Sequence, residues 1–216
     1  MLKLYGMPLS NYFNMVKHAL LEKGLEFEEV YVRPSQEPDF LQKSPMGKVP
    51  LLETEQGYLT ETDAILDYLE EGCTGPALFP AEPFARARVR QLMKTQELYV
   101  ETPAHDLIGA LFGREVPAHV IENSRPAVSR GLAAISRLAR FSPWIAGEQF
   151  SCADIVVFYS LTLSNRLTGL VYHWDLLDEV PGMRAWFELM QAREVTVQVM
   201  VESDAAAQAL AARHAR

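Results

Sequence analysis

Ser10 is the first residue of this chain whose type and position suggest chemistry. It lies between a short strand-like run, 2–5, and a helical pattern that begins at Asn11 and ends near Gly24. Backbone N–H groups in the first turn of a helix have no intrahelical partner, and the local field there favours an anion. The Ser10 hydroxyl is therefore suited to stabilise a thiolate, which another molecule must supply because this stretch has no cysteine.

A second chemical feature is Pro50, which opens a strand in the sequence SPMGKVPLL. Proline removes a hydrogen-bond donor from the sheet, so it belongs at an edge or a special turn. A cis Val49–Pro50 bond, a form that about 5–6% of X–Pro bonds in folded proteins adopt, would leave the Val49 N–H and C=O open to a bound peptide.

A third feature is the helix start in TETDAILDYL, which we predict to have Thr60 as its cap and Asp63 as the reciprocal partner of that cap. Backbone N–H groups at Thr62 and Asp63 would point at a carboxylate placed above them, and the Thr62 hydroxyl adds a donor. Glu61 would bind an ammonium group nearby. Together these groups suit the end of a ligand that carries both an amine and a carboxylate, as an amino acid does.

The elements that must position these residues alternate between strand and helix. The predicted order is strand 2–5, helix 11–23, strand 27–32, a short helical piece 38–43, strand 50–53, a short strand 58–59 and helix 61–71. A strand–helix–strand connection gives a parallel pair, whereas the hairpin LLETEQGYLT is antiparallel. We expect a small mixed sheet, followed by a linker in the Gly- and Pro-rich sequence GCTGPALFPAEP.

The rest of the chain has a helical pattern only. We predict helices at 84–112, 117–140, from 151 and around 181–192, followed by an alanine-rich tail. Pro103 predicts a bend in the first of these helices. Ser151 and Asp154 have the spacing of a capping box, for which a structural role is favoured.

Composition excludes several classes of function. The chain has 216 residues, and its formal charge of −8 disfavours nucleic acid or an anionic membrane as the main partner. Cys73 and Cys152 are far apart, which predicts neither a disulfide framework nor a redox dithiol but a reducing, cytoplasmic location. We expect no signal segment and no membrane helix.

Metal and phosphate chemistry also lack support in the sequence. The five histidines have no metal-ligand spacing, so we predict no metal site. The sequence has no G-x-S-x-G, no G-x-x-x-x-G-K-[ST] and no G-x-G-x-x-G after a strand.

In this order and spacing, LYGMPLSN, SPMGKVPLL, TETDAI and WIAGEQFSCADIVVF resemble the cytosolic glutathione S-transferase superfamily over nearly the whole chain. The resemblance implies an α/β thioredoxin-like N-terminal domain, 1–78, and an all-α C-terminal domain, 86–216. It further implies a homodimeric, cytoplasmic enzyme of detoxification, with glutathione as co-substrate and a small hydrophobic electrophile as the other substrate.

The resemblance also implies roles for individual residues. Val49, beside Pro50, would bind glutathione together with Glu61 and Thr62, and Lys48 would lie near the glycyl carboxylate. The family's familiar Glu-Ser pair is here Glu61-Thr62, which keeps the hydroxyl.

Ser10 resembles the serine of the serine-dependent classes, since the cysteine of one bacterial class is absent there. A thiol of pKa about 8.5 is only about 3% ionised at pH 7, and lowering its pKa by about two units requires roughly 2.7 kcal/mol. A charge-assisted hydrogen bond contributes about 1.5–3 kcal/mol. Ser10 is thus predicted to donate a hydrogen bond, with Tyr5 and Asn11 as alternative donors and Tyr12 as a weaker one.

Four residues of the helical half are candidates for the electrophile pocket on family precedent: Tyr99, Pro103, His105 and Phe112. Ordinary core packing is the competing interpretation for them. Two other functions remain open, namely a glutathione-dependent peroxidase or isomerase and a non-catalytic binding module with this fold.

Overall fold

The computed structural model describes residues 1–214, which form two compact units. One unit contains residues 1–78 and the C-terminal segment from 192, and the other contains residues 79–191. The C-terminal segment, which the sequence predicts to be part of the helical domain, belongs in the structure to the first unit, because its helix packs against the first helix of the chain.

The first unit is built on a four-stranded mixed sheet. Its elements are β1 (Leu2–Gly6), α1 (Asn11–Glu22), β2 (Phe27–Tyr31), α2 (Pro38–Leu41), β3 (Leu51–Thr54), β4 (Gly57–Thr60) and α3 (Thr62–Gly72). The strand order is β2-β1-β3-β4, in which β1 and β2 are parallel and the other pairs antiparallel. The predicted parallel pair and antiparallel hairpin are both confirmed.

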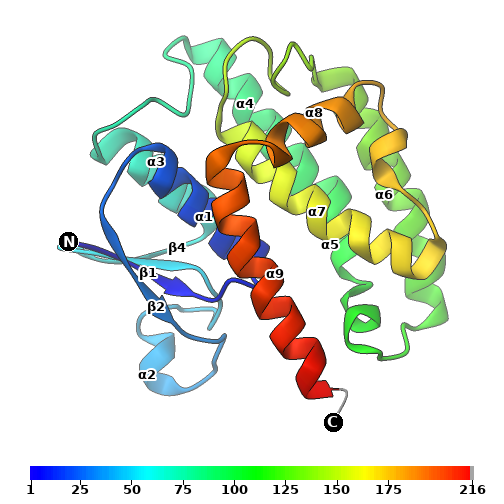
Figure 1. Cartoon of the computed structure of the whole chain (residues 1–216), viewed down its shortest axis with the longest axis horizontal. Coiled ribbons are helices and arrows are strands. Elements are labelled where there is room, and N and C mark those ends of the chain that lie inside the picture. The colour runs from blue at the N-terminus through cyan, green and yellow to red at the C-terminus, as the bar shows by residue number, and fades with distance from the viewer. Residues whose placement is uncertain (215–216) are drawn as a thin grey trace. The chain divides into compact units, whose positions relative to one another are not determined.

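Apolar residues at alternate strand positions and at helical spacing form the core of this unit. Figure 1 shows α1 and α3 on one face of the sheet and α2 on the other. Leu4 and Leu52 are fully buried, and so are the inward-facing side chains of the two long helices: Met15, Val16, Ala19, Leu20, Ile65 and Leu69. Each Å² of apolar surface that is buried contributes about 25 cal/mol of stability. This packing therefore holds in place the helices that precede and follow the candidate site.

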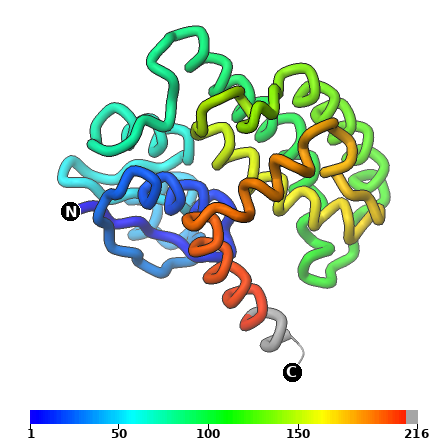
Figure 2. Tube along the Cα trace, turned by 45° about the horizontal axis from the view of Figure 1, so that its top comes forward, coloured from blue at the N-terminus to red at the C-terminus, as the bar shows by residue number. Residues whose placement is uncertain are grey.

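The C-terminal helix α9 (Glu194–His214) lies alongside α1 in both views (Figure 2). Lys17 of α1 is buried, and its Nζ lies 2.5 Å from a carboxylate oxygen of Glu202 in α9 and 2.6 Å from one of Glu29 in β2. A buried ammonium group is costly unless it is paired. These two carboxylates therefore tie α1 to the sheet and to the C-terminal helix.

The second unit is helical. Its elements are α4 (Pro83–Gln96), the π-helical η1 (Glu97–Glu101), α5 (Thr102–His105), the 3₁₀-helical η2 (Ile108–Phe112), α6 (Ala118–Leu138), α7 (Cys152–Tyr172), the 3₁₀-helical η3 (Leu176–Asp178) and α8 (Met183–Gln191). Among the described residues, no helix combines the length and apolar character that a membrane crossing requires.

The prediction of one bent helix over 84–112 is wrong in detail, because the structure divides this stretch into α4, η1, α5 and η2. The π-helical turns lie where α6 comes closest: a Cβ placed on Gly131 of α6 would stand 2.1 Å from the Tyr99 carbonyl oxygen. Pro103 follows within the first turn of α5.

The capping box that begins α7 is confirmed. The Asp154 carboxylate is fully buried and accepts hydrogen bonds from the Ser151 N–H at 2.9 Å, the Ile145 N–H at 2.8 Å and the Trp186 indole N–H at 2.8 Å. One side chain therefore joins the start of α7 to the preceding loop and to α8.

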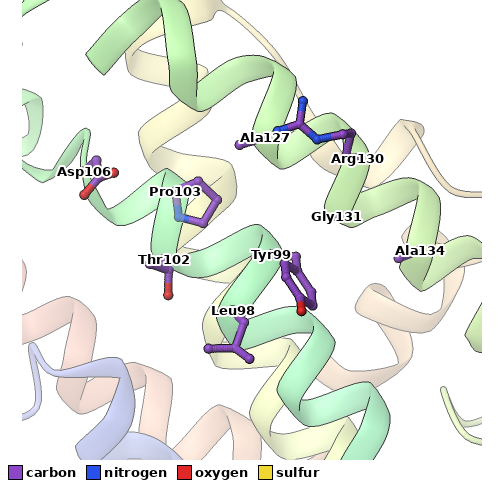
Figure 3. Close-up of a pocket in the computed structure, with 9 residues that line it drawn as sticks. All are labelled: Leu98, Tyr99, Thr102, Pro103, Asp106, Ala127, Arg130, Gly131 and Ala134. Carbon is purple, nitrogen blue, oxygen red and sulfur yellow. The ribbon is translucent and has the colours of Figure 1, made fainter. Parts of the chain in front are cut away.

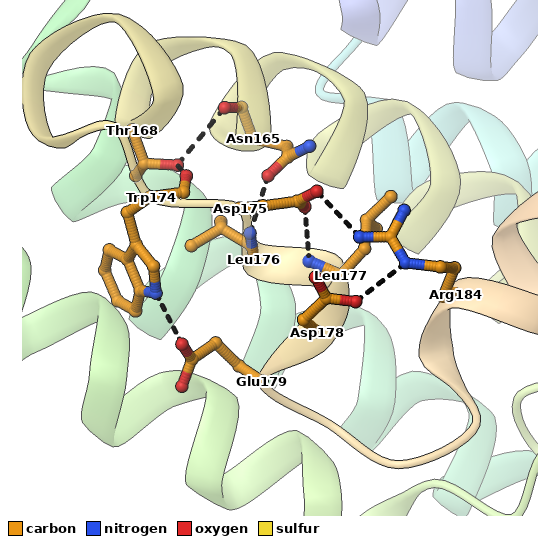
Figure 4. Close-up of polar contacts among 9 residues, drawn as sticks. All are labelled: Asn165, Thr168, Trp174, Asp175, Leu176, Leu177, Asp178, Glu179 and Arg184. Carbon is orange, nitrogen blue, oxygen red and sulfur yellow. Dashed lines mark hydrogen bonds and ion pairs between the residues drawn. The ribbon is translucent and has the colours of Figure 1, made fainter.

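Polar contacts also fix the segment between α7 and α8 (Figure 4). The Asn165 side-chain oxygen accepts from the Leu176 N–H at 2.6 Å, and Arg184 bonds Asp175 and Asp178 at 2.7 Å each. Figure 4 shows these side chains converging on η3. This network has a structural role, since it connects neighbouring elements of the helical unit.

Candidate active site

Three segments of the first unit meet at one end of the sheet. The register pairs Tyr5 of β1 with Leu51 of β3, and Leu51 with Thr60 of β4. Residues that follow β1, precede β3 and follow β4 therefore all lie at the same end of the sheet. The sheet thus brings together Ser10, the Val49–Pro50 segment and Glu61, which are far apart in the sequence.

Ser10 is the N-cap of α1, as its position in the sequence predicts. Its backbone is extended (φ −85°, ψ 116°), and its Oγ accepts a hydrogen bond from the Phe13 N–H at 3.3 Å. Because Oγ acts as the acceptor in this bond, the hydroxyl proton is left to donate elsewhere. The first turn of α1 contains no acidic residue that would neutralise its positive end.

Tyr5 uses its hydroxyl differently. The hydroxyl donates to Glu53, which pairs with Lys3, two residues back along β1 and away from Ser10. This hydrogen bond and burial raise the pKa of Tyr5 well above its usual value. A donor already committed to a carboxylate is a poor candidate to stabilise a thiolate at the other end of the strand, so the structure disfavours Tyr5 in that role.

Asn11 keeps its place as an alternative donor. It is the first residue of α1 and is partly exposed, directly after Ser10. A side chain in the first helical turn leans toward the N-terminus of the helix, the end at which Ser10 lies.

The segment before β3 presents a backbone edge. The Val49–Pro50 bond is cis. Val49 makes no backbone–backbone hydrogen bond within the part of the chain that the structure describes. Lys48, the residue before Val49, is held by the buried Ser44 hydroxyl. This hydroxyl accepts from the Lys48 N–H at 3.1 Å and donates to the Lys48 C=O at 2.8 Å. The Lys48 side chain is exposed.

Glu61 has an unusual backbone conformation. Its φ of 65° lies in the left-handed region, which non-glycine residues rarely occupy and which concentrates at functional sites. Glu61 is the N-cap of α3 but makes no side-chain capping bond, and Thr62 is the first helical residue. The predicted Thr60 cap is wrong, because pairing with Leu51 keeps Thr60 in β4. The Glu61 carboxylate is exposed beside the start of the helix.

Two of the four predicted pocket residues line a cavity of the helical unit. The cavity has a volume of about 350 Å³ between the η1–α5 segment and α6, and Tyr99 and Pro103 form part of its wall (Figure 3). His105 and Phe112 are not among the lining residues, which are Leu98, Tyr99, Thr102, Pro103, Asp106, Ala127, Arg130, Gly131 and Ala134.

The sequence analysis missed Asn14. Its side-chain amide is 3% exposed and donates to the Pro8 carbonyl oxygen at 2.9 Å, within the loop that leads to Ser10. A signal was present in the sequence: an amide stands in the apolar face of α1 beside Phe13 and Met15, one helical turn after Ser10.

Comparison with known proteins decides the family. The family model described as glutathione S-transferase, N-terminal domain, matches residues 4–77, and the one described as glutathione S-transferase, C-terminal domain, matches residues 118–189. The chain belongs to the glutathione S-transferase family.

Relatives in this family match nearly the whole length of the chain. A glutathione S-transferase of Pseudomonas putida is 45% identical over 206 residues, which cover 95% of this chain and 94% of the relative. The maleylacetoacetate isomerase of Pseudomonas aeruginosa is 28% identical over 195 residues, covering 85% of this chain and 91% of the relative. The crystal structure of a glutathione S-transferase from Rhodospirillum rubrum, 28% identical, covers 92% of this chain and 91% of its own with a TM-score of 0.75.

Proposed function

We propose that this glutathione S-transferase family member transfers glutathione to a small apolar electrophile and that Ser10 stabilises the glutathione thiolate. The observation that carries the proposal is the geometry of Ser10: its Oγ accepts from Phe13 at the start of α1, so its proton is available to the sulfur. A charge-assisted hydrogen bond and the helix end together supply the roughly 2.7 kcal/mol that lowering a thiol pKa by two units requires.

The same end of the sheet offers matching groups for the rest of glutathione. Val49 would pair its N–H and C=O with the cysteinyl backbone of the tripeptide, alongside Pro50, as a strand pairs with an edge. Glu61 would bind the γ-glutamyl ammonium group, and the N–H groups and hydroxyl at Thr62 its carboxylate. Lys48 is the proposed partner of the glycyl carboxylate.

The reaction then needs no further cofactor. The bound thiol loses its proton to solvent, the thiolate attacks the electrophilic carbon, and a carbon–sulfur bond forms. In a substitution the leaving group departs with the electron pair of the bond that breaks. In an addition, the electron pair of the carbon–carbon double bond takes up a proton from water.

We further propose that the cavity beside η1 binds the electrophile. Tyr99 and Pro103 give it an apolar wall, and its volume of about 350 Å³ lies within the range of small-molecule sites. His105 and Phe112 do not line this cavity, so we assign them no contact with the electrophile.

Ser10→Ala tests the catalytic proposal. We expect the Kd for glutathione to stay within a few-fold and turnover with an aryl halide to fall at least tenfold, because the donor to the sulfur is lost. The exposed Ser129 of α6 provides a matched control, and Ser129→Ala should change neither quantity. Unchanged turnover in Ser10→Ala would transfer the role to Asn11.

A second candidate reaction is glutathione-dependent isomerisation. It is favoured by the 28% identity with the maleylacetoacetate isomerase of Pseudomonas aeruginosa. In such a reaction the thiolate adds to a double bond and leaves again after rotation, so glutathione is regenerated. Parallel assays with an aryl halide, an organic peroxide and a cis-configured unsaturated diketo acid would separate transfer, peroxide reduction and isomerisation, and inactivity toward all three would favour a binding module.

The homodimer and the cytoplasmic location that the resemblance implies stay predictions. Sedimentation of the purified protein would check the first, and fractionation of cells the second.

A further inference from the structure

We infer that Asn14 is a positioning residue for Ser10, an inference that rests on the function proposed above. Asn14 lies in the first half of α1, and its side chain is almost completely buried. The amide Nδ2 donates to the Pro8 carbonyl oxygen at 2.9 Å. The side chain thus reaches back from the helix to the loop that carries the proposed thiolate donor.

The Pro8 carbonyl belongs to the central peptide of a β-turn. The turn spans residues 7–10 and is closed by a hydrogen bond from the Ser10 N–H to the Met7 C=O at 2.9 Å. Type I and type II turns differ by a flip of this central peptide, and proline suits the second position of both. A bond to the Pro8 oxygen therefore selects one orientation of the peptide.

The orientation of the Pro8–Leu9 peptide is compatible with the backbone conformation of Leu9. A type II turn needs a positive φ at its third position, here Leu9. The non-glycine residues with positive φ within residues 1–214 are Glu61, Phe141 and His173, so Leu9 is not one of them. Asn14 therefore holds the turn in the form that Leu9 adopts without strain.

A second observation separates this role from ordinary packing. The Asn14 Oδ1 is buried and has no hydrogen-bond partner among residues 1–214. A buried acceptor without a donor lowers stability, and a leucine of similar size would remove that cost. The amide is thus poorly explained by stability alone, and its one satisfied group is the Nδ2 that holds the loop.

The backbone completes the connection to Ser10. The Asn14 N–H donates to the Ser10 C=O at 3.0 Å, so helix, turn and serine form one closed hydrogen-bonded unit. Stabilisation of a charge by a hydroxyl depends on a donor that is already oriented before the charge forms. Loss of the Asn14 amide should therefore weaken thiolate stabilisation without removing any group that binds the tripeptide.

Asn14→Leu tests the inference in the full-length protein. The ultraviolet thiolate band of bound glutathione is followed against pH, together with steady-state kinetics. We expect the pKa of the bound thiol to rise by about one, from about 6.5 to about 7.5, so that the thiolate fraction and the turnover at pH 7 fall about threefold. The KM for glutathione should stay within about threefold. Asn14→Ala, which removes the same donor, replaces the leucine variant if that variant does not fold.

Thr196→Val is the matched control, because the Thr196 hydroxyl is also buried without a partner but lies in α9. It should leave the thiol pKa unchanged. A thiol pKa in the Asn14 variants equal to that of the native protein would overturn the inference. Ser10→Ala, measured alongside, separates the two proposals. If Ser10→Ala also leaves the thiol pKa unchanged, the proposed role of Ser10 fails. If Ser10→Ala raises the thiol pKa but the Asn14 variants do not, only the role of Asn14 is refuted.

Discussion

At the scale of single residues, Tyr5 and Ser10 show how hydrogen-bond direction decides between two hydroxyls. The Tyr5 hydroxyl donates to Glu53, whereas the Ser10 hydroxyl accepts from Phe13 and keeps its proton. We therefore predict that Tyr5→Phe leaves turnover and the glutathione KM within about threefold of the native values. Stability should fall by about 1 kcal/mol, because the half-buried Glu53 carboxylate loses its donor. Steady-state kinetics and thermal unfolding measure the two effects.

Tyr58→Phe is a suitable companion to that variant, since the Tyr58 ring packs edge-on against Tyr5 at a centroid distance of 6.3 Å. It perturbs the same face of the sheet and should also leave turnover intact. A tenfold loss of turnover in Tyr5→Phe, with Tyr58→Phe near native, would return Tyr5 to the catalytic role.

The sequence was informative about residues whose role depends on local backbone structure. Ser10 as an N-cap, the Ser151–Asp154 box and the proline before β3 follow from signals a few residues long. The neighbours of Glu61 in the sequence indicate its role, but they do not predict its positive φ, because they favour Thr60 as the cap of the helix. The pairing of Thr60 with Leu51 is a tertiary contact, and it overrides the local capping preference.

At the scale of elements, the π-helical η1 shapes the proposed electrophile cavity. Wider turns leave Leu98 and Tyr99 more than half exposed while α6 approaches their backbone through Gly131. Apolar periodicity predicts that this stretch is helical but not the width of its turns, because the cause is the approach of another helix. Of the four predicted pocket residues, Tyr99 and Pro103 line this cavity and His105 and Phe112 do not. Their role in binding the electrophile stays a prediction.

We predict that Tyr99→Ala raises the KM for an apolar aryl electrophile by roughly 5- to 30-fold, which corresponds to about 1–2 kcal/mol of lost apolar contact. The KM for glutathione should not change, since its proposed binding groups lie in the other unit. Phe84→Ala is the matched control, because Phe84 is an exposed aromatic residue that does not line the cavity. Equal effects of the two variants on the electrophile KM would contradict a binding role for the cavity.

At the scale of the whole molecule, a buried histidine and its carboxylate partner link stability to pH. His18 is fully buried in α1, and burial lowers its pKa despite the nearby Glu22, whose carboxylate lies 3.0 Å from Nε2. Burial would raise the pKa of Glu22, but hydrogen bonds from His18 and Arg193 together lower it. The folded state therefore favours a neutral imidazole beside an ionised carboxylate.

The direction of the pH dependence follows from these two shifts. Below the unfolded-state pKa of His18, about 6.5, the unfolded chain binds a proton that the native state does not, so stability falls as the pH drops through this range. The contribution of Glu22 is lost at lower pH, below about 4.5, as its native carboxylate becomes protonated. Both groups thus act in the same direction, and their combined contribution to the free energy of unfolding is fully present only above about pH 6.5.

We therefore predict that the free energy of unfolding declines between pH 7.5 and 5, with each unit of pKa difference worth about 1.4 kcal/mol. Urea unfolding at a series of pH values measures this slope. His18→Gln keeps a hydrogen-bond donor for Glu22 but does not titrate, so its slope above pH 5 should be shallower. The exposed His119 gives the control, and His119→Gln should keep the native slope. If His18→Gln keeps the native slope as well, the acid sensitivity arises from other groups, because the loss of a site that titrates differently in the two states must flatten the curve.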